Sequence, residues 1–336
     1  HASSAASDVY KRQFLIYMSE GIAEVNNINI WWEDFGNSSN PSILLIMGAN
    51  ANCMHWPPEF IEPLVDAGFH VIRYDNRDVG KTTWLNKEPL FSKLLKFLPT
   101  SIQIKFVDYI FGQGPNEDGV FTQNPDDASK AKYKLSDMAK DGIAIMDHLK
   151  VDKAHILGAS MGGMIGQVIA LDYPERTLSL TPIMSSPGMG DTNLSGMTQS
   201  MVQAIKDSYM LNLQDRDEDA IVCIYRVLSG SRFPFNEDKF REQLKLVIEH
   251  GDNPYTGHAE AVNASPSRLE RLHEIKVPTL VIHGTEDAIL PFDHGEAIAK
   301  GIPHSELMTL EGVGHELPVE LNDEIISRLV EHFRKA

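Results

Sequence analysis

The sequence has few cysteines, no long apolar run and no excess of basic residues, and each shortage excludes a class of protein. Only Cys53 and Cys223 occur among 336 residues, too few for a disulfide framework, so we expect two free thiols in a reducing compartment. No stretch approaches the ~18–20 uninterrupted apolar residues of a membrane-spanning helix. No H-E-x-x-H or C-x-x-C spacing indicates a zinc site, so we expect no bound metal.

Acidic residues outnumber basic ones in this chain. It has 47 Asp and Glu against 30 Lys and Arg, which gives a net charge of −17 at pH 7. A negatively charged surface repels phosphate groups, which argues against nucleic acids and anionic membrane surfaces as partners. Hydrophobic residues make up 42% of the chain, which is ample for a core. The length fits one large α/β domain with an insertion, or two domains.

The first residues of the chain fit neither a strand nor a helix. Residues 4–13 resemble the translated adapter sequence at the ends of some metagenomic genes, and His1 matches the end of a purification tag. We interpret residues 1–13 as a tail derived from a tag or adapter and exclude it from the fold. Because this tail hides the natural N-terminus, the cytoplasmic location that we expect leaves secretion open.

Ser160 is the most informative residue of the sequence. It lies in the G-x-S-x-G pattern of residues 158–162, between an apolar, strand-like segment at 153–158 and a helix-like segment at 161–172. A sharp turn between a strand and a helix presents a serine hydroxyl at the helix N-terminus, where free N–H groups favour negative charge. Glycines two residues away on either side allow close approach of the neighbouring segments. The pattern predicts a nucleophile, although an ordinary tightly packed turn has the same composition.

A serine hydroxyl needs a base to activate it, and the base needs an orienting acid. Asp287 follows an apolar strand predicted at 278–284, at the carboxyl end where open α/β sheets place their ligands. His315 lies in a glycine-rich loop after the strand predicted at 306–310. We therefore expect Ser160, Asp287 and His315 to meet at one edge of a sheet.

Each of these two partners has an alternative interpretation. Asp287 could cap a helix that begins near Pro291, and Glu286 could be the acid in its place. His315 is one of 13 histidines and could be an ordinary loop residue. The order of the three motifs, each directly after a predicted strand, is more specific than any of them alone.

The oxyanion of an acyl-transfer reaction needs two backbone N–H donors. Met161, the residue after Ser160, is expected to supply one of them. The apolar strand predicted at 41–47 ends in residues 48–50, and Ala49 is the most suitable second donor. Because only the backbone of Ala49 would act, its side chain need not be polar. A simple turn between a strand and a helix is compatible with both assignments.

These motifs make the chain resemble the α/β-hydrolase superfamily from about residue 21 to residue 333. Within it, the sequence is similar to the group that contains aclacinomycin methylesterase, and this similarity rests on residues 47–50, 55–56, 70–80, 158–163 and 167–170. The resemblance implies roles for five residues: Ser160 as nucleophile, Asp287 as acid, His315 as base, and Ala49 and Met161 as oxyanion donors. It also implies hydrolysis of an ester without a cofactor.

Two features depart from that group. Residues 81–133 form a longer segment than expected, and residue 49 is Ala where family members often carry Gly. These departures bear on the choice of substrate rather than on the chemistry. A serine at position 160 argues against haloalkane dehalogenases and epoxide hydrolases, which use Asp at this place.

The pattern along the chain predicts an α/β-hydrolase fold, with a mostly parallel central sheet flanked by helices and an inserted helical cap. Residues 14–186 and 271–336 form the predicted core. The strand pattern stops at residues 187–270, which form the predicted cap. Residues 85–130 are a further insertion that we place near the pocket, and its apolar part at 90–112 is expected to be helical.

Three charged residues, Asp75, Arg77 and Asp78, follow the strand predicted at 70–75 and could take part in catalysis. We interpret them instead as residues that fix the loop after this strand, because structural ion pairs are common at such places.

The sequence therefore predicts a serine carboxylesterase that acts on a small-molecule ester through an acyl-enzyme, as a monomer or homodimer. Two alternatives stay open. The same triad could act on a peptide, lactone, thioester or C–C bond, or in perhydrolysis, because a fold does not determine its reaction. A ligand receptor built on a hydrolase scaffold is the other alternative, although such receptors usually lack part of the triad.

Overall fold

The structure is a computed structural model of the chain, and it describes residues 18–88, 90–111, 130–189, 193–251 and 253–336. The tail predicted at 1–13 lies outside the described residues, as do residues 112–129 of the predicted insertion. Among the residues that the structure describes, no helix has the length and apolar character that would be needed to cross a membrane.

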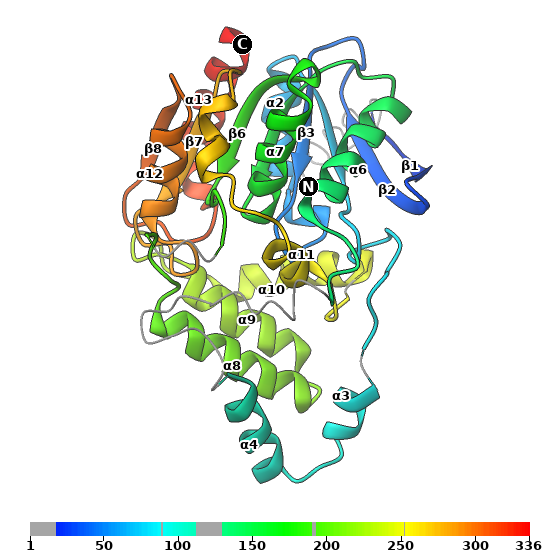
Figure 1. Ribbon diagram of the computed structural model, residues 1–336, viewed down its shortest axis with the longest axis vertical. Coiled ribbons are helices and arrows are strands. Elements are labelled where there is room, and N and C mark those ends of the chain that lie inside the picture. Colours follow the sequence, from blue (N-terminus) through cyan, green and yellow to red (C-terminus); the bar gives the residue numbers. More distant parts are fainter. Residues whose placement is uncertain (1–17, 89, 112–129, 190–192, 252) are drawn as a thin grey trace, which may run out of the picture.

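An eight-stranded sheet with the order β1-β2-β4-β3-β5-β6-β7-β8 forms the centre of the molecule (Figure 1). Its strands are β1 (Met18–Val25), β2 (Ile28–Phe35), β3 (Ser42–Ile46), β4 (His70–Tyr74), β5 (Ala154–Ala159), β6 (Thr177–Ile183), β7 (Leu280–Gly284) and β8 (Glu306–Leu310). β2 pairs antiparallel with both β1 and β4, and the pairs from β4 to β8 are parallel. Asn26 and Asn27, with φ values of 51° and 62°, form the turn between β1 and β2. The predicted mostly parallel sheet is confirmed.

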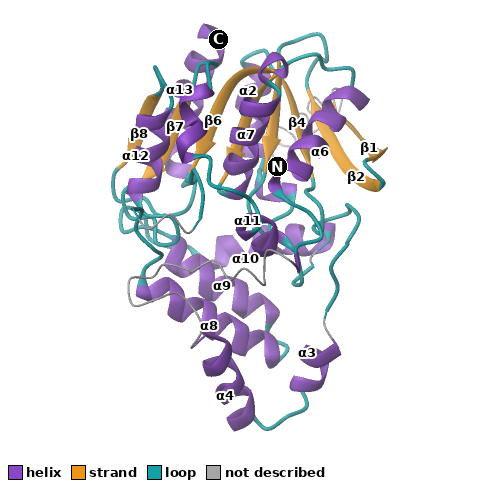
Figure 2. Cartoon of the chain, viewed as in Figure 1, coloured by secondary structure: helices purple, strands orange, loops and turns teal. Residues whose placement is uncertain are grey.

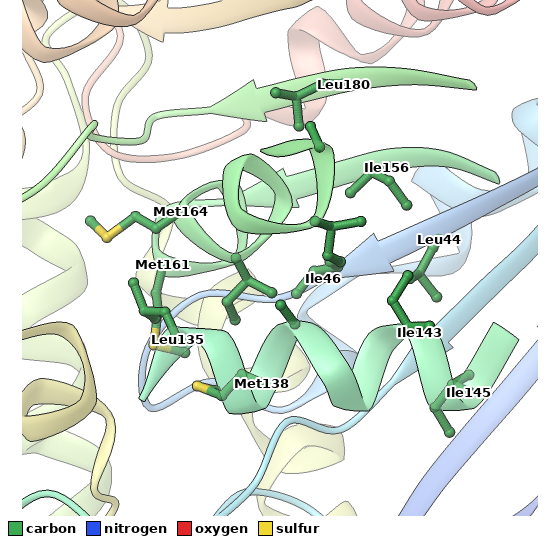
Figure 3. Close-up of a cluster of buried hydrophobic side chains, with 14 of the residues drawn as sticks. Leu44, Ile46, Leu135, Met138, Ile143, Ile145, Ile156, Met161, Met164 and Leu180 are labelled. Atoms are coloured by element: carbon green, nitrogen blue, oxygen red, sulfur yellow. The ribbon is translucent and has the colours of Figure 1, made fainter. Parts of the chain in front are cut away.

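Helices cover both faces of this sheet. The core helices are α2 (Pro58–Asp66), α6 (Leu135–His148), α7 (Met161–Asp172), α12 (Phe292–Gly301) and α13 (Asn322–Lys335). Leu44 and Ile156 point to the face that α6 and α7 cover (Figure 3), whereas Ile43 and Leu157 belong to the cluster that α2 and α13 cover. Because successive side chains of a strand point to opposite faces, both faces of β3 and β5 are buried, and their sequences are apolar except for Ser42 and His155.

The cap consists of helices and loops in the residues that the structure describes (Figure 2). Its helices are α8 (Gln199–Leu213), α9 (Asp217–Leu228), α10 (Glu237–His250) and α11 (His258–Asn263), and the short helix η4 (Leu269–Glu274) leads back to the core. The cap helices α8 to α10 lie below the sheet in Figure 1.

The insertion before α6 contributes α3 (Leu90–Leu95) and α4 (Thr100–Phe111), so its expected helical character is confirmed. Leu95 and Val107 pack with Leu213 at the end of α8, and Figure 1 shows both helices at the end of the molecule farthest from the sheet. Within these two helices, Leu95 and Val107 are thus buried against the cap, whereas Leu94, Ile102 and Ile104 are exposed.

Candidate active site

Ser160 occupies the turn between β5 and α7 in a strained conformation. Its φ is 54° and its ψ is −119°, a region that costs energy for a residue with a side chain. The Ser160 N–H donates to the carbonyl of Ile183 at 2.9 Å, and the Ser185 hydroxyl donates to the Ser160 carbonyl at 2.8 Å. The neighbouring strand β6 and the residues after it thus hold this turn in place.

The glycines of the motif are required by close backbone contacts. A Cβ atom at Gly158 would lie 2.2 Å from the carbonyl oxygen of Gly162, and one at Gly162 would lie 2.0 Å from the carbonyl oxygen of Ile46. No side chain fits at such distances, so β3, β5 and α7 can converge below Ser160 only because glycine occupies both positions.

The loop after β3 passes directly beside Ser160. A Cβ atom at Gly48 would lie 3.1 Å from the Cβ of Ser160, and Ala49 follows with an exposed position. Met161 is the first residue of α7. Within the described part of the chain, the N–H groups of Ala49 and Met161 donate to no protein acceptor. Two backbone N–H groups near the serine are therefore free to donate to a ligand oxygen.

Asp287 and His315 form a buried pair. Asp287 Oδ2 lies 2.6 Å from His315 Nδ1, and the two side chains are 0% and 9% exposed. Asp287 Oδ1 also accepts from the N–H groups of Ile289 and Leu290 at 3.0 and 2.8 Å, so the carboxylate stabilises its own turn as well. Burial alone would raise the pKa of Asp287, but the charge of His315 and hydrogen bonds from His283 and His315 hold that pKa well below its usual value. Because the ionised carboxylate accepts from the Nδ1–H of His315, Nε2 of the same ring remains for a second partner.

Glu286, the alternative acid, points elsewhere. It is exposed, and its carboxylate accepts from the N–H and the hydroxyl of Ser231 at 2.7 Å each. The structure thus brings Asp287, and not Glu286, to His315.

Comparison with known families identifies the fold to which these residues belong. The chain matches the family described as alpha/beta hydrolase fold over residues 41–320. The chain belongs to the α/β hydrolase fold family.

Relatives of this α/β hydrolase confirm the predicted resemblance to the methylesterase group. It is 28% identical over 331 residues to the rhodomycin D methylesterase of Streptomyces peucetius, which covers 93% of this chain and 97% of the relative. It is 29% identical over 332 residues to that of Streptomyces sp. strain C5, with the same coverage. The esterase of Exiguobacterium antarcticum has the same fold, with a TM-score of 0.66, 18% identity, and coverage of 94% of this chain and 100% of that one.

The cap holds the histidine loop of this α/β hydrolase in position. The N–H of His315 donates to the carbonyl of Leu228, the last residue of α9, at 2.7 Å. The Glu316 carboxylate accepts from the Gly230 N–H at 3.0 Å and from the Ser229 hydroxyl at 2.9 Å. These contacts were not foreseen from the sequence, because no local pattern links residues 228–230 to residues 315–316.

The charged residues after β4 fix their loop, as the sequence analysis interpreted them. The Asp78 carboxylate accepts from the Tyr133 hydroxyl at 2.6 Å and from the Gly257 N–H at 3.0 Å, besides two bonds from Asn86. Although burial alone would raise it, the pKa of Asp78 stays below its usual value because of these donors. Arg77 pairs with Asp141 of α6, with Nη2 and Oδ1 2.8 Å apart.

Cys53, Asp75 and His250 form the one described group whose side chains are close enough to share a metal ion, with their ligand atoms within 4.8 Å of one another. Asp75 already accepts N–H bonds from Cys53, Lys81 and His250 at 2.9, 2.9 and 2.7 Å. Burial, reinforced by the charge of Asp75, raises the pKa of the Cys53 thiol well above its usual value, which disfavours the thiolate that a metal needs. Asp75 therefore connects the end of β4 by hydrogen bonds to the loop after β3, through Cys53, and to the cap, through His250. Both cysteines are free, as expected.

Proposed function

We propose that this α/β hydrolase is a serine carboxylesterase in which Ser160, His315 and Asp287 act as nucleophile, base and acid. The observation that carries the proposal is the 2.6 Å contact between Asp287 and His315, on loops that follow β7 and β8, together with the strained Ser160 that follows β5. Parallel neighbouring strands bring their carboxyl ends to one edge of a sheet, where the three residues are expected to meet.

In the proposed mechanism, His315 removes the proton of the Ser160 hydroxyl as its oxygen attacks the ester carbonyl. The N–H groups of Ala49 and Met161 stabilise the oxyanion, each contributing about 10²–10³ in rate. His315 then gives the proton to the leaving alcohol, and it activates the water that cleaves the acyl-enzyme. Asp287 stays ionised and keeps the Nδ1–H tautomer of His315. No step needs a cofactor.

The relatives support a small leaving alcohol. Two proteins that match this chain over 97% of their length are named rhodomycin D methylesterases, so we propose an ester of a small alcohol such as methanol as the substrate. We also propose that residues 14–186 and 271–336 form the catalytic core and that residues 187–270 form the cap over it. The contact between His315 and Leu228 supports this division.

The test is hydrolysis of p-nitrophenyl esters from acetate to laurate, and of methyl esters by titration of the released acid. Ser160→Ala and His315→Ala should each lower kcat by about 10⁴–10⁶ without loss of the folded state. Ser305→Ala is the matched control. The Ser305 hydroxyl donates to the carbonyl of Ala299, and Ser305 lies at the amino end of β8, away from the carboxyl ends of the strands. Turnover at the wild-type rate in Ser160→Ala would refute the proposal. A folded wild type that is labelled at Ser160 but cleaves no ester would favour another bond type or a receptor.

A further inference from the structure

A segment of the cap holds the loop that carries the proposed donor Ala49. The N–H of Asn50 donates to Nδ1 of His258, the first residue of α11, at 2.8 Å. The hydroxyl of Thr256 donates to the side-chain oxygen of Asn50. Asn50 is thus held through its backbone and its side chain by residues about 200 positions away in the sequence, with separations of 208 and 206.

The contacts of His258 fix its tautomer. Its Nε2 lies 2.6 Å from the carbonyl oxygen of Arg77, and its Nδ1 faces the N–H of Asn50. A carbonyl can only accept and an amide N–H can only donate, so Nε2 carries the proton and Nδ1 offers its lone pair. The side chain is fully buried, at 0% exposure. His258 therefore acts as a neutral bridge between the loops after β3 and after β4.

This bridge acts one residue away from the proposed oxyanion donor. Asn50 has a φ of 60°, a left-handed conformation that Asn adopts more readily than most residues with a side chain, and the bonds from His258 and Thr256 hold it there. Because Ala49 precedes Asn50 directly, a change in the backbone at Asn50 would turn the Ala49 N–H away from the position of the oxyanion. Donors of this kind act only when they are already aligned before the reaction.

We infer that His258 is a positioning residue for the oxyanion hole, which aligns the Ala49 N–H through the backbone of Asn50. The cap thereby contributes to the rate of the chemical step. This inference rests on the proposed esterase function and names a determinant of its rate outside the triad.

Two substitutions separate the two hydrogen bonds of His258. The amide of Asn places a polar atom near the position of Nδ1, so His258→Asn can still accept from Asn50 but loses the bond to Arg77. The amide of Gln reaches the position of Nε2, so His258→Gln can still donate to Arg77 but loses the acceptor for Asn50. Both place a neutral amide in the same buried site, so a merely structural role would affect them alike.

The experiment measures kcat, KM, the inhibition constant of a trifluoromethyl ketone and urea unfolding for both variants. We expect His258→Gln to lower kcat about 10- to 100-fold, which is less than the full contribution of one oxyanion donor to the rate. KM should change by less than about threefold. The inhibitor should weaken by a similar factor, whereas His258→Asn should stay within about threefold of the wild type in kcat. His155→Gln is the control, because His155 is also buried but contacts Ser179 on β6, so it should lose stability without losing kcat.

Equal kcat values for His258→Gln and the wild type, or equal losses in the Gln and Asn variants, would overturn the inference. If His258→Gln fails to fold, Thr256→Val tests the same link, since it removes the hydroxyl that donates to Asn50 and should lower kcat about three- to tenfold. An unchanged kcat there would overturn the inference as well. Retained turnover in Ser160→Ala would instead refute the proposed function itself, so the two failures are distinguishable.

Discussion

The turn at Ser160 and the loop at Ala49 and Asn50 lie side by side, but they are held in different ways. Ser160 owes its conformation to the glycines of its own motif, which let β3, β5 and α7 converge. The loop at Asn50 owes its conformation to His258 and Thr256 of the cap. The half of the site at Ser160 therefore depends on a short glycine motif as well as on its bonds to Ile183 and Ser185, whereas the half at Asn50 depends on contacts with the distant cap.

The largest effect is expected from disrupting the glycine motif around Ser160. In Gly162→Ala, the new Cβ would lie 2.0 Å from the carbonyl oxygen of Ile46, a backbone atom that cannot move aside. We expect a loss of about 3 kcal/mol or more in the free energy of unfolding, measured with urea, or no folded protein. Gly166→Ala is the matched control on the same helix, because its Cβ would meet only the side-chain ends of Leu180 and Ile156, at 3.1 and 3.2 Å. Equal losses in both variants would contradict this explanation of the motif.

The next effect concerns the acid. Asp287→Asn removes the charge that holds the tautomer of His315, so kcat should fall about 10⁴-fold while the fold is retained. Glu286→Gln should leave kcat within about twofold, because Glu286 contacts Ser231 and not His315. Steady-state kinetics on one p-nitrophenyl ester measures both. A large loss of kcat in Glu286→Gln with a small loss in Asp287→Asn would instead identify Glu286 as the acid.

A smaller effect is expected in the pH dependence of stability, which involves buried histidines in both the cap and the core. Burial lowers the pKa of His258 in the cap to about 4, and it lowers those of His155 and His332 in the core to about 4 as well. Between pH 6.5 and 4 the unfolded chain binds more protons at these histidines than the folded chain, so stability must fall as the pH falls. We expect each histidine to contribute up to about 1.4 kcal/mol per pH unit in this window.

Urea unfolding at pH 7, 6 and 5 measures this slope, and His155→Gln should reduce it by the share of one histidine. A free energy of unfolding that stays constant or rises from pH 6.5 to pH 5 would contradict the burial of these side chains in their neutral form.

The smallest effect is expected at Asn52, which also links the loop after β3 to the cap. The Asn52 side chain donates to the carbonyls of Val247 and Gly251 in the cap at 2.9 Å each. Asn52→Ala should lower the free energy of unfolding by about 1–3 kcal/mol, since buried carbonyls lose their donors, and kcat by less than the loss in His258→Gln. Asn37→Ala is the control, because Asn37 only stabilises an exposed turn at Ser39. A variant of Asn52 as stable as that control would show that this link to the cap is weak.

The same contrast explains how much could be predicted from the sequence. The helix expected at 161–172 and the strand expected at 306–310 have these bounds in the structure, because apolar segments between turn residues are local signals. The sequence also placed Asp287 and His315 after strands, and the structure brings them together.

Contacts with the cap were not predictable in this way. His258 is one histidine among 13, and nothing near it in the sequence indicates that it meets Asn50. Partner choice over long separations depends on the folded arrangement and leaves no periodic pattern in the sequence.

Ser160 is the proposed nucleophile of an ester hydrolase. The most direct test is labelling of the wild type with a fluorophosphonate, followed by mass spectrometry of its peptides and by kinetics on the labelled protein. We predict one adduct on the peptide that contains Ser160, loss of ester turnover in proportion to labelling, and no adduct in Ser160→Ala. An adduct on another residue, or full turnover by protein labelled at Ser160, would contradict the claim.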